Sequence, residues 1–125
     1  MSLLLDTHTL LWWLTDDPTL TRDARRAIAD GSAHVIVSAA SVWEIAIKRR
    51  IGKLDAPDDL LRQLAACRMD LRPLDPHDVW LAGNLPDHHR DPFNRAIGAQ
   101  ALRGGLCLVP PDARLAAYGV DIIPA

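Results

Sequence analysis

The sequence predicts an α/β fold: a central, mostly parallel sheet of four to five strands with helices on both faces. Short apolar runs at 3–5 and 35–37 show no polar alternation, as expected for strands buried on both faces. Such runs alternate along the chain with segments of helical spacing, which is typical of a parallel sheet covered by helices. A length of 125 residues fits one domain, 1–125.

Capping residues, prolines and glycines set the expected boundaries of the helices. Asp75-Pro76 and Asp91-Pro92 each combine an N-cap with a proline at the first helical position, and Gly52 ends an earlier helix. Helices are expected after residue 6, over about 24–29, 42–51, 57–64, 76–85 and 91–104, and over 112–118; strands are expected over 3–5, 35–37, 71–74, 106–109 and 120–123.

Composition restricts the possible functions. A hydrophobic content of 49% supports a real core, and the net charge of −2 gives no overall basic character, so any RNA contact must use a local patch or a bound cation. Cys67 and Cys107 lie far apart without metal-ligand spacing, so two buried, reduced thiols are expected. The apolar start lacks a basic region and is interrupted by Asp6 and His8. We therefore expect no signal peptide, no membrane span and a cytoplasmic location.

Acidic and polar residues follow the predicted strands or open neighbouring helices. In a parallel sheet the carboxyl ends of the strands meet at one edge, where functional groups gather. Carboxylates that share a pocket remain ionised together only when a cation lies among them, and oxygen ligands suit Mg²⁺ or Mn²⁺. Such an ion lowers the pKa of its bound water and stabilises a pentacoordinate phosphorus, as a nuclease requires. The residues concerned are Asp6, Ser38, Glu44, Asp91, Asn94 and Asp112.

Each acid also has a purely structural explanation. Asp6, Asp91 and Asp112 all stand where an N-cap is expected. Glu44 is spaced to pair with Lys48 one helical turn later. The functional hypothesis therefore depends on the position that they share at strand ends, and not on any one of them.

Four segments in this order together resemble a known family. They are LLLDTHTLLWWL at 3–14, SAASVWEIAIKRRIGKL at 38–54, HHRDPFNRAIGAQAL at 88–102 and LVPPDARLAAYGV at 108–120. The chain resembles the PIN domain, and specifically the VapC-like toxins of bacterial toxin–antitoxin pairs. The resemblance implies a PIN-like three-layer fold, a four-acid magnesium site, ribonuclease activity, dimerisation and inhibition by a cognate VapB-like antitoxin.

The resemblance also implies which residues form the site. Asp6 and Glu44 match the first two acids of the family and Asp112 matches the fourth, although the family has Thr-Ala or Thr-Arg where this chain has Pro110-Pro111. The implied catalytic residues are Asp6, Glu44, Asp112 and Asn94, and the implied metal ligands are Asp6, Asp112, Asn94 and Asp91.

The third acid departs from the family pattern. The family segment reads Asp-Pro-Phe-Asp-Arg with its second Asp as a ligand, and this chain has Asn94 there. An amide offers a neutral oxygen, so the site loses one negative charge and should hold magnesium less tightly. Asp91 lies three residues earlier on the same helical face, which allows it to compensate directly or through water.

Further residues are candidates for contacts with RNA. The hydroxyls of Thr7 and Ser38 either orient a metal-bound water or satisfy local backbone groups. Arg90 and Arg95 flank the site as candidates for phosphate contact, and pairing with a site carboxylate is the alternative for Arg95. Lys48 either holds the RNA backbone or lies on a solvated helix face. His88 and His89 are expected in a solvated loop, with metal ligation as the alternative.

Two surfaces are expected to receive protein partners. An antitoxin tail is predicted to dock around Leu11, Trp12 and Trp43, because aromatic residues in a groove are favoured anchors. A homodimer is predicted through two helices whose apolar residues exceed what a thin domain buries. Those residues are Leu60, Leu61, Leu64, Val79, Trp80 and Leu81.

Two rival functions remain open on the sequence. A magnesium-dependent phosphatase also begins with a strand followed by Asp, but it carries a second Asp two residues later, where this chain has His8. A catalytically impaired PIN-like binding module is the other alternative, and it depends on Asn94.

Overall fold

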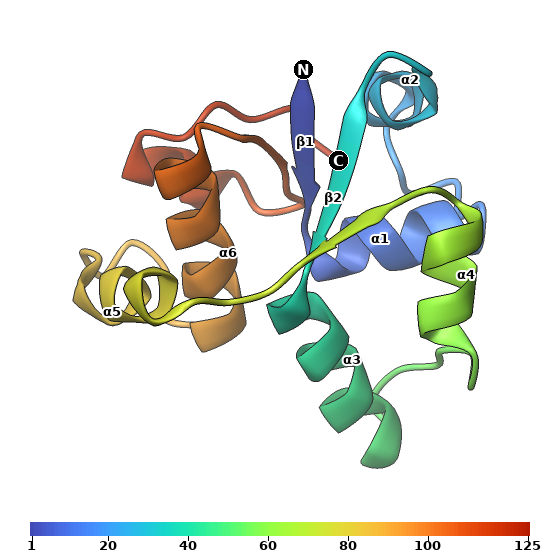
Figure 1. The fold of residues 1–125 in the computed structure, drawn as a ribbon, viewed down its shortest axis with the longest axis horizontal. Helices are drawn as coiled ribbons and strands as arrows, with labels where there is room; N and C mark the ends of the chain where they lie inside the picture. Colours follow the sequence, from blue (N-terminus) through green and yellow to red (C-terminus); the bar gives the residue numbers. More distant parts are fainter.

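Four parallel strands form one sheet in the order β3-β2-β1-β4, in a computed structural model that describes residues 1–125 (Figure 1). Helices α5 and α6 cover one face of the sheet and α1, α2 and α4 cover the other, which confirms the predicted α/β fold. The elements are β1 (Ser2–Leu5), α1 (Thr7–Leu14), α2 (Arg22–Ala29), β2 (His34–Ser38), α3 (Ala39–Arg50), α4 (Leu60–Ala66), β3 (Asp70–Arg72), α5 (Pro76–Asn84), α6 (Pro92–Gly104), β4 (Cys107–Val109) and the 3₁₀ helix η1 (Ala113–Tyr118).

The sheet separates two hydrophobic cores because neighbouring strand residues point to opposite faces. Leu3 and Leu5 of β1 belong to the core beneath α1, α2 and α4, whereas Leu4 belongs to the core beneath α5 and α6. All three are fully buried, which explains why the run shows no polar alternation. No helix is long and apolar enough to cross a membrane.

The C-terminal elements differ from the prediction. The strand expected over 120–123 is wrong as a full strand, because this segment makes only an isolated parallel bridge between Leu108 and Ile122. The helix expected over 112–118 is a 3₁₀ helix that begins at Ala113.

Two elements in the middle of the chain also differ from the prediction. The strand expected over 71–74 ends at Arg72, since Pro73 has no N–H for a further ladder bond. Helix α4 begins at Leu60, later than expected, and Asp59 makes no side-chain cap. Cys67 at the end of α4 is exposed, so the expectation that both thiols are buried is wrong for this residue.

Side-chain caps fix where the helices begin at the carboxyl edge of the sheet. Asp6 accepts a hydrogen bond from the His8 N–H and so caps α1, while Ser38 caps α3 in the same manner. Asp91 accepts from two backbone N–H groups of α6. The caps hold these side chains at defined positions beside the strand ends.

Arg95 of α6 ties down the connection between α5 and α6. Its guanidinium donates to the carbonyl oxygens of Ala82 at 3.0 Å, Leu85 at 2.6 Å and His89 at 2.9 Å. Its side chain is only 12% exposed and also contacts Asp87. The Arg95 cation is therefore used inside the fold.

Replacing Arg95 with Met should lower the free energy of unfolding by about 2–3 kcal/mol, because several carbonyl groups lose a charged donor. Urea denaturation measures this change. Arg90→Met is the matched control, since Arg90 is exposed, and it should change stability by about 0.5 kcal/mol or less. Equal stabilities of the two variants would show that Arg95 does not hold this connection.

Candidate functional site

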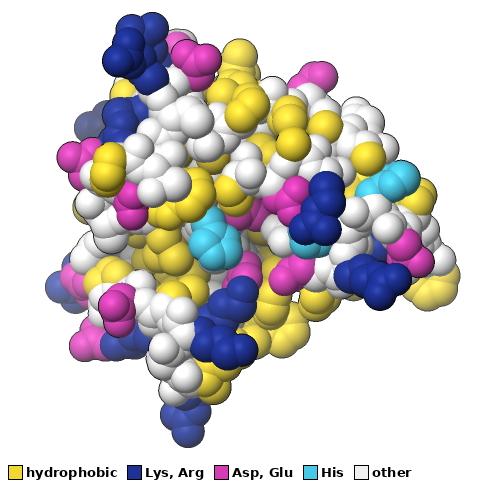
Figure 2. Space-filling view, turned by 180° about the vertical axis from the view of Figure 1, so that it is seen from behind, with side chains coloured by type: hydrophobic (Ala, Val, Ile, Leu, Met, Phe, Trp, Pro, Cys, Tyr) yellow, Lys and Arg dark blue, Asp and Glu magenta, His cyan; other side chains and the backbone are white.

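The parallel register brings the first acids to one edge of the sheet. Leu5 at the end of β1 pairs with Val37 of β2 and with Val109 of β4. Asp6 and Ser38 therefore leave the sheet at the same level, and Asp112 follows β4 three residues after Val109. Figure 2 shows acidic side chains gathered near the centre of one face of the molecule, with histidine and basic side chains around them.

Glu44 is buried at this edge, and both of its carboxylate oxygens have partners. Thr7 donates from Oγ1 to Glu44 Oε1 at 2.6 Å, and Lys48 Nζ lies 2.5 Å from Glu44 Oε2. The Ser41 hydroxyl lies 3.0 Å from Thr7 Oγ1. Glu44 retains only 4% of its exposure, so these contacts compensate a charge that has little water around it.

Asp6 is similarly buried, with 3% exposure. Its Oδ2 accepts from the His8 N–H at 3.1 Å and lies 3.8 Å from His8 Nδ1. The interaction with Asp6 raises the pKa of His8, and the charge of Glu44 raises it further. Asp6 Oδ1 has no hydrogen-bond partner and is not sealed from solvent, which leaves one oxygen available.

Asp112 is held by two basic side chains. Arg114 donates from Nε to Asp112 Oδ2 at 2.9 Å and from Nη2 to the same oxygen at 2.6 Å, and it holds the pKa of this carboxyl well below its usual range. His89 Nε2 lies 3.1 Å from Asp112 Oδ2. Asp112 also caps η1 through the Arg114 N–H.

His89 connects this acid to the start of α6. Its Nδ1 accepts from the Asp91 N–H at 3.1 Å, so in the neutral ring the proton lies on Nε2, which faces Asp112. The Asn94 amide nitrogen lies 3.3 Å from the same Nε2. His89 is therefore the side chain through which Asp91, Asn94 and Asp112 are brought together.

The donor set fits a hard divalent cation in its chemistry. Asp6 Oδ1 and Asp91 Oδ2 are carboxylate oxygens that no hydrogen bond uses, and Asn94 adds an amide. Oxygen ligands of this kind are those that Mg²⁺ and Mn²⁺ prefer. No three His, Cys, Asp or Glu side chains lie close enough together to hold a metal ion. Basic side chains of the protein already pair with Glu44 and Asp112.

Two of the residues expected to contact RNA, Ser38 and Arg95, make hydrogen bonds to backbone groups of the protein. Ser38 is fully buried and its hydroxyl accepts from the Ala40 N–H, so the backbone alternative describes it. Arg95 is occupied by the carbonyls of the α5–α6 connection, so a phosphate contact from Arg95 would have to break these hydrogen bonds. Thr7 and Lys48 contact Glu44 directly, and Arg90 is exposed beside Asp91.

Sequence reasoning missed two participants in the site. His89 is buried, with 7% exposure, and does not lie in a solvated loop as expected. The second is Arg114, which follows Asp112 by two residues, a spacing at which an N-cap carboxylate meets a backbone N–H donor. The position of His89 depends on how the 85–91 connection folds back over Tyr118, which no local sequence pattern indicates.

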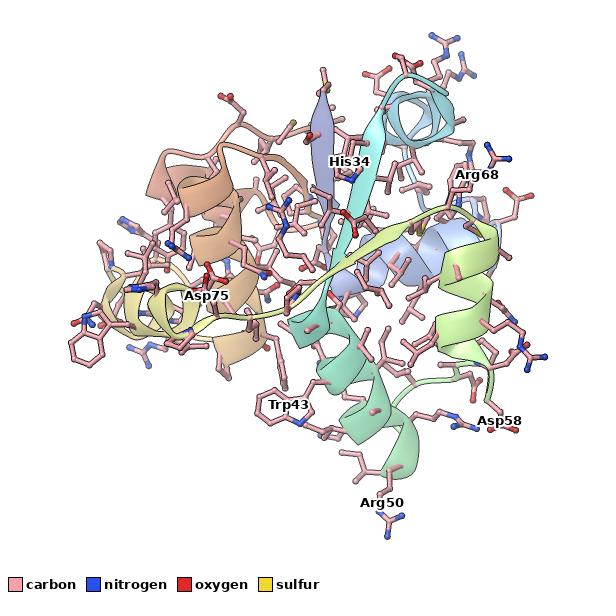
Figure 3. All side chains as sticks on the ribbon, viewed as in Figure 1. His34, Trp43, Arg50, Asp58, Arg68 and Asp75 are labelled. Atoms are coloured by element: carbon pink, nitrogen blue, oxygen red, sulfur yellow. The ribbon has the colours of Figure 1, made fainter.

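The residues of the predicted antitoxin surface have different surroundings. Leu11 and Trp12 pack against the core beneath α1, α2 and α4, whereas Trp43 stacks edge-on against Phe93 of α6 with ring centroids 5.3 Å apart. Figure 3 shows Trp43 on α3, on the side toward α5 and α6. A pocket of about 430 Å³ lies there, lined among others by Trp43, Phe93 and Val79.

Comparison with known proteins identifies the family. The family model of the PIN domain matches residues 3–120. No curated protein matches the chain. Among solved structures, VapBC2 from Rickettsia felis bound to a promoter DNA fragment is similar at 11% identity and a TM-score of 0.71, over 98% of each chain.

Two further solved structures have the same fold. FitAcB from Neisseria gonorrhoeae is 17% identical with a TM-score of 0.66, over 98% of this chain and 96% of that chain. A toxin–antitoxin complex from Klebsiella pneumoniae is 15% identical with a TM-score of 0.67, over 97% of this chain and 95% of that chain. At these identities the likeness concerns the fold alone. The family match spans nearly the whole chain, and the chain therefore belongs to the PIN domain family.

Proposed function

We propose that this chain is a metal-dependent endoribonuclease that acts as the toxin of a toxin–antitoxin pair. The observation that supports the proposal is that Asp6, Glu44, Asp91 and Asp112 all lie toward the carboxyl edge of the sheet in a chain of the PIN domain family. PIN domains are generally nucleases that use divalent metals. The similar solved structures include toxin–antitoxin complexes, which supports the same assignment here. We place its action in the cytoplasm.

In this proposal Mg²⁺ or Mn²⁺ supplies a water of lowered pKa and stabilises charge on the phosphorus. Asp6, Asp91, Asn94 and Asp112 would hold the ion. Thr7 fixes the carboxylate of Glu44 by its short hydrogen bond, and the His8 N–H fixes Asp6. Arg90 is exposed at the rim, where its charge can bind an RNA phosphate.

A catalytically impaired binding module is the second candidate. Asn94 favours it, because an amide stands where the family has a carboxylate. The pairing of Asp112 with Arg114 favours it too, since the fourth acid is already neutralised. His8 replaces the second Asp that a phosphatase needs, so nothing in the site favours that alternative.

Asn94→Asp should bind Mg²⁺ roughly tenfold or more tightly than the native chain, because it adds one negative charge to a poorly solvated pocket. It should also cleave RNA faster in a magnesium-dependent manner. Calorimetry and a fluorescent RNA assay measure the two effects. Glu44→Gln in the Asn94→Asp background should abolish cleavage again.

Two outcomes would change this assignment. If the native chain cleaves RNA as fast as Asn94→Asp, then Asp91 serves as the third acid. If Asn94→Asp binds metal but cleaves nothing, then the binding-module alternative holds.

We further propose that an antitoxin segment docks beside Trp43. The Trp43 side chain is 61% exposed although it borders two hollows, one toward Phe93 and Val79 and one toward Leu61 and Leu71. An exposed aromatic residue between apolar hollows is a favoured anchor for a partner segment.

Trp43→Ala should weaken binding of a co-expressed VapB-like antitoxin by roughly 2 kcal/mol or more, about thirtyfold. This is the loss expected for an aromatic anchor that becomes buried in the complex. Trp12→Ala is the matched control, because Trp12 packs against its own core and should affect stability more than affinity. Surface plasmon resonance measures the affinities. Unchanged affinity in Trp43→Ala would place the docking site elsewhere.

A homodimer remains a proposal, now restricted to α5. Leu60 and Leu64 of α4 are buried in the core of the chain itself, so they cannot contribute to a dimer surface as expected. Val79 and Trp80 of α5 are 49% and 76% exposed. Figure 1 shows α4 and α5 on opposite sides of the sheet, and we assign the two-fold contact to α5 because it carries the larger exposed apolar side chain, Trp80.

Trp80→Ser should convert a dimer to a monomer, because it removes the largest exposed apolar side chain of α5. Leu61→Ser on α4 is the control and should leave the dimer intact, although Leu61 is 54% exposed. Analytical ultracentrifugation at micromolar concentration measures the mass. A native chain that sediments as a monomer would rule the dimer out.

A further inference from the structure

Lys48 occupies an unusual place among the acids. It lies one turn after Glu44 on α3, with its ammonium nitrogen 2.5 Å from Glu44 Oε2. The Glu44 side chain is 5% exposed, whereas that of Lys48 is 30% exposed, so a buried carboxylate is paired with a cation that reaches it from the solvent side. Such a pair differs from an ordinary surface pair, because the carboxylate has little water with which to replace its partner.

More than one acid faces this ammonium. The hydrogen bond with Glu44 raises the pKa of Lys48, and the charges of Asp91 and Asp6 raise it further. Three acids from α1, α3 and the start of α6 thus act on one positive charge. His8 of α1 is the other titratable side chain near Glu44 and Asp6. The charge of Lys48 lowers the pKa of His8, against the effect of the two acids.

We propose that Lys48 is a built-in counter-ion of the acid cluster, whose ammonium a divalent cation must displace in order to bind. The inference rests on the proposed function in one respect, because it takes this cluster as the metal site. The ammonium at Glu44 and an ion held by Asp6 and Asp91 are attracted by the same acids, and two positive groups so placed repel each other. Lys48 therefore lowers the affinity of the site for metal and stabilises the metal-free protein.

The partial exposure of Lys48 makes displacement feasible. Its flexible four-carbon stem can turn the ammonium into solvent without disturbing α3. Thr7 continues to hold Glu44 Oε1 during this exchange, so the carboxylate keeps its orientation. Once released, the ammonium lies beside the site, where it can bind an RNA phosphate.

The test compares Mn²⁺ binding to the native chain, to Lys48→Met and to Arg50→Met, by calorimetry without RNA. Arg50 is the matched control, because it is an exposed cation at the far end of α3 that points away from the molecule (Figure 3). Lys48→Met should bind Mn²⁺ at least roughly tenfold more tightly than the native chain. Arg50→Met should bind as the native chain does.

Stability supplies an independent readout. Without metal, Lys48→Met should melt at a lower temperature than the native chain, because Glu44 loses its counter-charge, and saturating Mn²⁺ should restore most of the loss. Lys48→Gln keeps a hydrogen-bond donor without the charge and serves if Lys48→Met does not fold alone. Variants that stay unfolded at saturating Mn²⁺ would overturn the inference, since the metal then fails to replace the ammonium.

The remaining outcomes separate this inference from the proposed function. Equal or weaker Mn²⁺ binding in both Lys48 variants overturns the inference and leaves the proposed nuclease standing. Absence of Mn²⁺ binding in every variant overturns both. Tighter Mn²⁺ binding supports the inference whether or not the Lys48 variants cleave RNA, because Lys48 is itself a candidate phosphate contact.

Discussion

Compensation of buried negative charge is the constraint on which the functional edge of this protein depends. Asp6 and Glu44 are nearly inaccessible, and an isolated carboxylate in such a place is costly unless donors or cations surround it. The fold meets this requirement with donors from several elements. Thr7 and Lys48 contact Glu44, the His8 N–H contacts Asp6, and Arg114 contacts Asp112. The helices at this edge are therefore positioned by the acids as much as by the apolar cores.

The structural and functional explanations of these acids are compatible. An N-cap uses one oxygen of a carboxylate to accept backbone N–H groups, and it fixes the direction of the other oxygen. Asp6 and Asp91 both follow this pattern, since each accepts through one oxygen and leaves the second without a hydrogen bond. Capping thereby orients a ligand atom in advance, which reduces the reorganisation needed when a cation binds.

The extent to which the sequence predicted the structure follows from the range of the interactions involved. The buried strands and most helix starts are local features, so apolar runs and capping residues were sufficient to predict them. Arg95 and His89 owe their positions to the connection between α5 and α6, whose path is set by tertiary contacts with Tyr118. Their identity as charged or titratable residues suggested exposure, and only the folded connection shows that they are enclosed.

The surroundings of Trp43 on helix α3 were also not predictable from local sequence patterns. Helical spacing shows that Trp43 and Glu44 point in different directions, but it cannot say which neighbouring helix each one faces. Packing of α6 against α3 places Phe93 beside Trp43, while Leu11 and Trp12 remain on the opposite side of the sheet. The predicted antitoxin surface around Leu11, Trp12 and Trp43 therefore stays a prediction, and Trp43 is the exposed one of the three.

Asn94 and Lys48 both make the net charge of the site less negative. His89 Nε2 lies 3.1 Å from Asp112 Oδ2 and 3.3 Å from the Asn94 amide nitrogen, so Asn94 stands beside Asp112 without adding charge. A carboxylate at position 94 would stand beside Asp112 and would need a cation nearby to stay ionised. With an amide there, an ammonium at Glu44 and a guanidinium at Asp112, two of the four acids are paired with cations before any metal arrives. A site built in this way tolerates the absence of metal, and it binds metal only where the ion's attraction for Asp6 and Asp91 exceeds the cost of releasing Lys48.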